Sequence, residues 1–143
     1  LVQAKTSGHG SFVDVSMTHE VAKLNIIAEH GLALDAARPR GEDWLTGGWP
    51  CYGVYPTADG RFLAVGSLEE KFWHVLCDAL EKPHLKALGC SEGVAALRVR
   101  KELADCFATQ PLAHWTDFFD AIDCCVTPVL TLAEAREHKL FKD

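Results

Sequence analysis

One short stretch, residues 52–80, restricts the fold of this chain more than any other. Its first half predicts two strands, Tyr52–Tyr55 and Phe62–Gly66, because both are rich in aromatic and β-branched residues. Asp59-Gly60 lies between them and favours a two-residue hairpin turn, since glycine tolerates the positive φ angle that such turns need. The second half carries apolar residues at helical spacing. We therefore expect a hairpin that leads directly into a helix.

The expected start of this helix places a carboxylate. Ser67 is predicted as the residue before the helix, and Glu70 three residues later would complete a Ser-x-x-Glu capping box. Glu69 would then be the second helical residue, among unpartnered backbone N–H groups at the positive end of the helix dipole. Such a position favours the ionised carboxylate that a general base needs. Acidic residues are also common in first turns for stability alone, so the spacing leaves both roles open.

Length and charge exclude several classes of protein. The chain has 143 residues, enough for one domain with appendages, and 48% of them are hydrophobic. Its net charge of −6 argues against binding to nucleic acid or to an anionic membrane surface, because both need a basic surface. No apolar run reaches membrane-spanning length. The chain begins at Leu1 without a methionine, and we expect it to be a piece of a longer protein.

The six cysteines indicate a reducing environment. They show no C-x-x-C pair and no metal-ligand spacing with the seven histidines. Several fall on apolar faces of predicted elements. Reduced, mostly buried thiols in a cytoplasmic protein, without a metal site, are therefore expected.

Before the hairpin, the sequence predicts a strand and a helix for which it predicts no packing partner. Ser11–Ser16 is predicted as a strand, and Met17 to about Leu34 as a long amphipathic helix capped by Ser16 or Thr18. A lone strand and helix cannot bury their own apolar faces, so they should pack on another part of the protein or on a second copy. Residues 35–49 are rich in Pro, Gly and charge and indicate a linker.

After the hairpin and its helix, the pattern predicts a compact unit over residues 50–131. The further elements are a short helix at Pro83–Leu88, helices at Val94–Thr109 and Leu112–Ile122, a third strand at Cys124–Leu130 with Pro128 at its edge, and a helix from Leu132 toward His138 that Thr131 and Glu134 cap as a box. The strands are distant in sequence. The expected fold is α+β, with a small, mainly antiparallel three-stranded sheet and several helices.

Three segments resemble the family III CoA-transferase (CaiB/BaiF) superfamily. Residues 11–17 (Ser-Phe-Val-Asp-Val-Ser-Met) are similar to its strand-to-helix segment, and residues 55–73 (Tyr-Pro-Thr-Ala-Asp-Gly-Arg-Phe-Leu-Ala-Val-Gly-Ser-Leu-Glu-Glu-Lys-Phe-Trp) to its small-domain signature. Residues 123–131 (Asp-Cys-Cys-Val-Thr-Pro-Val-Leu-Thr) look more specifically like the α-methylacyl-CoA racemase branch.

The resemblance implies a two-domain protein in which two chains interlock as a homodimer. A Rossmann-like large domain would hold most of the coenzyme A. Residues 1–34 would be the end of the N-terminal part of that domain, 35–49 a linker, 50–131 the small domain, and 132–143 the start of a return linker helix. No separate cofactor is implied, since the coenzyme A thioester is itself the substrate.

The same resemblance assigns site residues. A thioester acidifies the proton on its α-carbon, and inversion of that centre needs one group to remove the proton and another to return one on the opposite face. Glu69 aligns with the carboxylate base of the family and Tyr52 with a tyrosine that lines the acyl site. Gly66, which has no side chain, would let the backbone turn tightly into the helix cap and would let substrate approach closely. The opposite-face histidine–aspartate pair would precede Leu1.

Two other functions stay open. A CoA-transferase would use an upstream aspartate nucleophile that forms a mixed anhydride, with Gly47-Gly48 as the candidate shielding loop. Alternatively, the chain on its own is a substrate-closing and dimer-forming module without catalysis.

Overall fold

The computed structural model describes residues 1–141 and divides into two units, Leu1–Arg38 and Pro39–Asp143. Each unit is described by itself. The division falls inside the segment that the sequence predicts as a linker. That segment is not wholly irregular, because Trp44–Gly48 forms a single π-helical turn, η1, and the Asp43 carboxylate accepts a hydrogen bond from the backbone N–H of Trp44.

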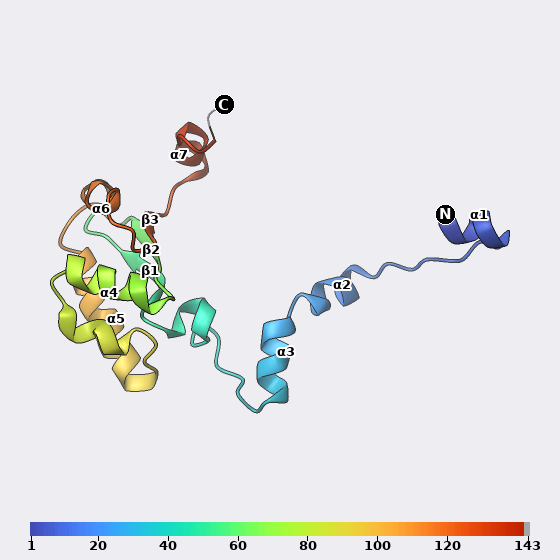
Figure 1. The fold of residues 1–143 in the computed structure, drawn as a ribbon, viewed down its shortest axis with the longest axis horizontal. Coiled ribbons are helices and arrows are strands. Elements are labelled where there is room, and N and C mark those ends of the chain that lie inside the picture. The colour runs from blue at the N-terminus through green and yellow to red at the C-terminus, as the bar shows by residue number, and fades with distance from the viewer. Residues whose placement is uncertain (142–143) are drawn as a thin grey trace. The chain divides into compact units, whose positions relative to one another are not determined.

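The second unit is built on a three-stranded antiparallel sheet. Strand β1 (Tyr52–Pro56) pairs with β2 (Phe62–Gly66), and β2 pairs with β3 (Val126–Pro128), in the order β1-β2-β3 (Figure 1). The predicted hairpin and the antiparallel α+β fold are confirmed. The third strand is shorter than predicted because Cys125, immediately before it, has a φ of 56° and interrupts the extended backbone.

The hairpin turn differs in detail from the two-residue turn expected at Asp59-Gly60. Thr57 N–H donates to the Arg61 carbonyl and Gly60 N–H donates to the Thr57 carbonyl, so the loop holds three residues. Gly60 follows the turn with a φ of 72°, in the left-handed region that favours glycine. Asp59 is freed to bond elsewhere, and its carboxylate accepts the backbone N–H of Leu112.

Besides η1, the structure describes five further helices in this unit, and their bounds agree with the predicted ones to within a few residues. They are α4 (Glu70–Ala79), the 3₁₀-helix η2 (Pro83–Leu88), α5 (Gly93–Phe107), α6 (Leu112–Phe119) and α7 (Leu132–Glu137). Helix α7 begins with the predicted capping box of Thr131 and Glu134. Helix α5 contacts β1, and α6 contacts β3.

The core lies on one face of the sheet. Strand residues that alternate toward this face, among them Tyr55, Leu63 and Val126, are buried. The ring of Phe107 from α5 packs on Tyr55 and, edge-on, on Trp115 from α6, with centroids 5.5 and 5.3 Å apart. On the opposite face of the sheet, Val54 remains 53% exposed, and the described helical element that lies against β1 there is the η1 turn.

The first unit departs from prediction. It holds three short helices, α1 (Val2–Ser7), α2 (Met17–Lys23) and α3 (Ile26–Ala33), and none of them buries a residue. The strand predicted at Ser11–Ser16 is not formed, because a strand needs a hydrogen-bonding neighbour and no described residue pairs with this segment.

The long helix predicted over residues 17–34 is interrupted. Leu24 and Asn25 donate their backbone N–H groups to carbonyls three residues back, which tightens the end of α2 before α3 begins. Ser16 caps α2 through its side chain, as expected.

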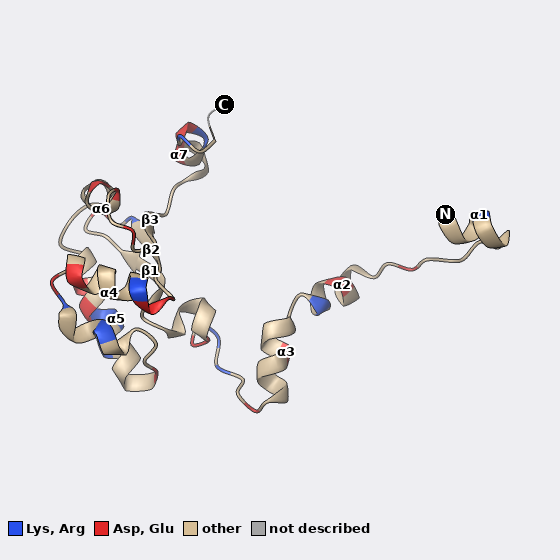
Figure 2. Ribbon diagram, viewed as in Figure 1, with Lys and Arg blue, Asp and Glu red and all other residues tan. Residues whose placement is uncertain are grey.

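Residues of both charge signs occur on α4 and on α5 (Figure 2). No described helix is long and apolar enough to cross a membrane.

Candidate functional site

A hollow of about 510 Å³ lies on the open face of the sheet. Strand residues form its floor and the η1 turn forms one border. The lining comprises Leu45, Thr46 and Gly47 from η1, residues 52–54 and 64–66 from the hairpin strands, and Arg100, Cys125 and Thr127. The walls are mostly small or apolar. This is a surface on which an apolar ligand chain can lie.

Two of the three predicted site residues meet in this hollow. Tyr52 opens β1 and Gly66 closes β2, and the two are direct cross-strand partners. Gly66 also donates its backbone N–H to the Cys125 carbonyl at 2.8 Å. A Cβ atom added to Gly66 would meet only that carbonyl oxygen, at an ordinary distance of 3.6 Å. Packing within the chain therefore does not require glycine here, contrary to the tight turn that the sequence suggested.

Glu69 lies beside the hollow without lining it. Its side chain is exposed and makes no hydrogen bond or ion pair with the described residues. Its charge is nevertheless near Cys125, a lining residue. The pKa of the Cys125 thiol is raised, first by burial and then by the neighbouring charges of Asp123 and Glu69. Glu69 is thus near enough to a lining residue of the hollow to influence it electrostatically.

The predicted capping box at the start of α4 is wrong. Ser67 is fully buried, and its hydroxyl donates to the Cys124 carbonyl at 2.6 Å instead of capping the helix. Helix α4 begins at Glu70, and Glu69 is the residue before it rather than the second helical residue. The Glu69 carbonyl accepts the N–H groups of Phe72 and Trp73, while its carboxylate stays free of the cap.

Arg100 brings a positive charge to the hollow, and the sequence analysis did not identify it. Its guanidinium donates to the Gly47 carbonyl and lies 5.5 Å from the ring centroid of Tyr55. A Cβ atom on Gly53 would lie 3.0 Å from the Arg100 Nη1 atom, so glycine makes room for it. Arg100 follows the buried Val99 on α5, and nothing in the helical spacing indicates that it reaches η1 and β1.

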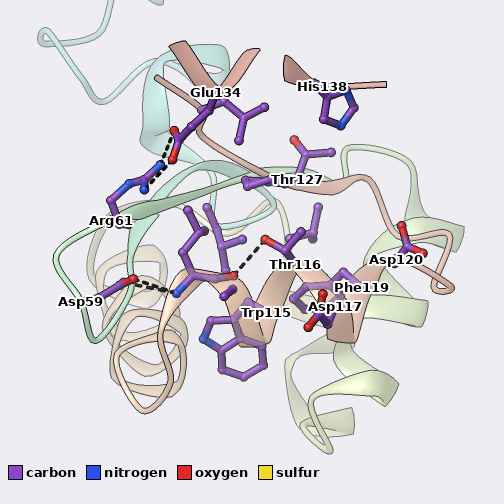
Figure 3. A pocket seen from close by; sticks show the side chains of 16 residues that line it. Asp59, Arg61, Trp115, Thr116, Asp117, Phe119, Asp120, Thr127, Glu134 and His138 are labelled. Carbon is purple, nitrogen blue, oxygen red and sulfur yellow. Dashed lines mark hydrogen bonds and ion pairs between the residues drawn. The ribbon is translucent and has the colours of Figure 1, made fainter. Parts of the chain in front are cut away.

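A second hollow, of about 560 Å³, holds none of the predicted site residues (Figure 3). Apolar side chains of β2, β3 and α6 line it, with acidic side chains around them. Arg61 and Glu134 lie together at one edge of it and form a two-bonded ion pair, with N–O distances of 2.8 and 3.0 Å. The pair ties the start of α7 to the hairpin, which indicates a structural role.

Groups of three or more potential metal ligands are not found among the described residues.

Comparisons with known proteins identify the family of this chain. A family model described as CoA-transferase family III matches residues 1–143. The chain belongs to CoA-transferase family III. It is 36% identical over 140 residues to an alpha-methylacyl-CoA racemase of Mus musculus and 37% identical over 144 residues to one of Homo sapiens. These alignments cover 97% and 96% of this chain but 37% and 36% of those proteins. The family III chain therefore spans little more than a third of the length of these relatives.

Less similar proteins agree with this family or with this fold. A CaiB/baiF CoA-transferase family protein of Caenorhabditis elegans is 30% identical over 136 residues. Two crystal structures of Rv3272 from Mycobacterium tuberculosis, one of them in an orthorhombic form, match with TM-scores of 0.70 and 0.66. They share 18% and 16% sequence identity with this chain, and each match covers 98% of this chain and 37% of that one. At that identity the likeness supports the fold alone.

Proposed function

We propose that this chain is the small-domain part of an acyl-CoA racemase that inverts the α-carbon of a 2-methylacyl thioester. The observation that carries the proposal is the pairing of Tyr52 with Gly66 at one end of the open sheet face, with Glu69 three residues further along the chain. The identity to alpha-methylacyl-CoA racemases over nearly the whole chain supports this branch of the family.

In this proposal the hollow accepts the acyl end of the substrate. Tyr52 provides an aromatic wall, and the missing side chain of Gly66 leaves room for the thioester beside the sheet. Arg100 adds a fixed positive charge that attracts an anionic group of the ligand. Coenzyme A enters as part of the substrate and no further cofactor is needed.

Glu69 acts as one of the two bases. Its exposed carboxylate makes no ion pair in the described chain, so it is available to a substrate bound beside it. The carboxylate removes the α-proton, the negative charge delocalises into the thioester as an enolate, and a group on the opposite face returns a proton. That second group belongs to a Rossmann-like large domain outside residues 1–143, in a homodimer of interlocked cytoplasmic chains.

The test is deuterium exchange in the full-length parent. With a 2-methylacyl-CoA in heavy water, the parent should incorporate deuterium at the α-carbon, and Glu69→Gln should reduce the rate at least about a hundredfold, the size of a lost general base. Glu70→Gln is the matched control, because Glu70 is a neighbouring exposed glutamate at the same helix start. Equal losses in both variants would contradict the assignment of Glu69.

A CoA-transferase is the second candidate, favoured by the family description and by the relative from C. elegans. Its upstream aspartate would form a mixed anhydride with the acyl group, and coenzyme A would then attack it. Gly47-Gly48 would shield this intermediate, and Gly47 does line the hollow. Acyl transfer between coenzyme A and a free acid that survives Glu69→Gln would support this reading over the racemase.

Residues 1–143 alone should not catalyse either reaction, because we place the second base or the nucleophile outside them. The isolated chain would serve as a closing and dimer-forming module. Incubation of the isolated chain with a 2-methylacyl-CoA in heavy water tests this, and deuterium incorporation above the buffer rate would overturn it.

A further inference from the structure

Two cysteines that are distant in the sequence lie side by side in the second unit. Cys51 immediately precedes β1, and Cys90 follows η2, yet their sulfur atoms are only 3.8 Å apart. Cys51 is buried, at 1% exposure, whereas Cys90 is exposed. Both line a hollow of about 470 Å³ that is separate in its lining from the one that holds Tyr52 and Gly66. A small reagent that reacts with the Cys90 thiol therefore brings its product next to the Cys51 thiol.

The backbone around both cysteines is held in place independently of the sulfur contact. Cys51 donates its backbone N–H to the carbonyl of Gly89, the neighbour of Cys90, at 3.1 Å. Gly89 is in turn pressed against the indole of Trp73, since a Cβ atom there would lie 2.8 Å from Trp73 Nε1. That nitrogen donates to the carbonyls of Leu85 and Lys86, at 3.0 Å each. The proximity of the two thiols is thus built into the packing of η2 on α4.

We propose that Cys51 and Cys90 form a modification site, at which a peroxide converts the two thiols into a reversible intramolecular disulfide. The sulfur atoms must approach by less than about 2 Å to reach bonding distance, which small side-chain rotations can provide. The site does not depend on the acyl-CoA chemistry proposed above.

The order of the steps follows from exposure. The accessible Cys90 thiolate attacks one peroxide oxygen, the O–O bond breaks, and hydroxide leaves with a proton as water, so that Cys90 becomes a sulfenic acid. The Cys51 sulfur then forms the S–S bond, its proton and the sulfenic hydroxyl leave as a second water, and peroxide has taken up two electrons. Burial and the adjacent Cys90 raise the pKa of Cys51 to about 12, so Cys51 is the resolving thiol rather than the first target.

The bond would join the residue before Tyr52 to the turn between η2 and α5. It would therefore restrict the end of β1 that borders the acyl hollow.

The experiment uses the whole chain and hydrogen peroxide. After a mild treatment, free thiols are alkylated under denaturing conditions and the protein is digested with trypsin. Cys51 lies in the tryptic peptide 41–61 and Cys90 in the peptide 87–98, each with a single cysteine. We expect these two peptides to appear as one disulfide-linked species, lighter by two hydrogen atoms than their sum, and to separate again after treatment with dithiothreitol.

Two variants make the result decisive. Cys90→Ser should abolish the linked species and leave Cys51 fully alkylated. In this variant the buried Cys51 thiol has lost the exposed thiol that peroxide oxidises first and with which it would form the disulfide. Cys125→Ser removes the other exposed cysteine and should leave the amount of linked species unchanged. Oxidation of Cys90 to sulfinic acid while Cys51 stays alkylatable would overturn the proposal, as would a linkage of either peptide mainly to Cys125 or to a second chain.

Discussion

The buried hydroxyl of Ser67 helps to fix the position of Glu69 at the start of α4. It lies between β2 and α4 and donates to the Cys124 carbonyl at 2.6 Å, with both residues at 0% exposure. This bond anchors the strand-to-helix connection to the segment that precedes β3. The chain then turns at Leu68, whose N–H donates to the Gly66 carbonyl, and Glu69 emerges at the surface. One hydrogen bond thus links the position of the proposed base to the sheet.

Ser67→Ala should destabilise the protein by about 1–3 kcal/mol, because it leaves a buried carbonyl without its hydroxyl donor. Urea unfolding measures the effect. Ser91→Ala is the matched control: the Ser91 hydroxyl bonds only locally, to the Leu88 carbonyl three residues back, and its loss should cost less than about 0.5 kcal/mol. Equal losses of unfolding free energy in the two variants would show that the long-range hydrogen bond of Ser67 stabilises the protein no more than the local bond of Ser91.

Helix α7 begins with a complete capping box formed by Thr131 and Glu134. Glu134 accepts the backbone N–H of Thr131 at 2.7 Å and its hydroxyl at 2.8 Å. The same carboxylate pairs with both terminal nitrogens of Arg61 (Figure 3). Arg61 also donates to the Val129 carbonyl. A local cap and a long-range ion pair therefore share one carboxylate, which sets the direction in which the chain leaves β3.

This arrangement predicts a pH dependence at α7. Arg61 and the bonds from Thr131 lower the pKa of Glu134 from 4.5 to about 2. Since the folded pKa lies below the ordinary value, the stabilisation is fully present above about pH 4.5 and is lost as the pH falls toward 2. An NMR titration of the Glu134 carboxyl should have its midpoint near pH 2, and Arg61→Gln should raise it.

Arg136→Gln is the control for this titration. Like Arg61→Gln, it removes one positive charge, but from an exposed residue of α7. The ion pair between Arg61 and Glu134 stays intact. The midpoint should then change little, and equal shifts in both variants would mean that general charge rather than the paired geometry sets the pKa.

The chain as a whole divides sharply in how much it buries. Among residues 1–141, every buried residue lies in the second unit, and the three helices of Leu1–Arg38 bury none. Large apolar side chains such as Phe12, Met17 and Leu24 are more than 80% exposed. An apolar surface of this kind indicates an interface, consistent with a chain that spans little more than a third of its relatives.

Limited trypsin digestion should therefore cut the first unit before the second. Cleavage needs a locally unfolded backbone, and α5 is held by the buried Val99, Leu103 and Phe107. The first stable product seen by mass spectrometry should begin at Gly41, after cleavage at the exposed Arg40. Early cuts at Arg98 or Lys101, at a rate equal to that at Arg40, would contradict this difference in stability. The chain in urea, cut at all sites alike, is the control.

Several predictions from local spacing are confirmed, although the capping box at Ser67 is wrong because its hydroxyl bonds to the distant Cys124 carbonyl instead. The buried stripe of α5 and the capping box at Thr131 both arise from contacts between residues three or four apart, which spacing records directly. The resemblance in residues 55–73 identified the family, because that segment combines a hairpin with a helix start. The strand at residues 11–16 failed for the complementary reason, since its hydrogen-bonding partner must come from elsewhere in space.

The apolar spacing of α5, the capped start of α7 and the family were thus readable from the chain before any coordinates, because contacts between residues three or four apart produce the first two. Only folding in three dimensions decided which groups separated by tens of residues would meet. Ser67 bonds to a carbonyl 57 positions away, Arg100 to one 53 away, and Cys51 lies against a thiol 39 away. Such meetings depend on how helices pack on the covered face of the sheet, and no local pattern contains that information.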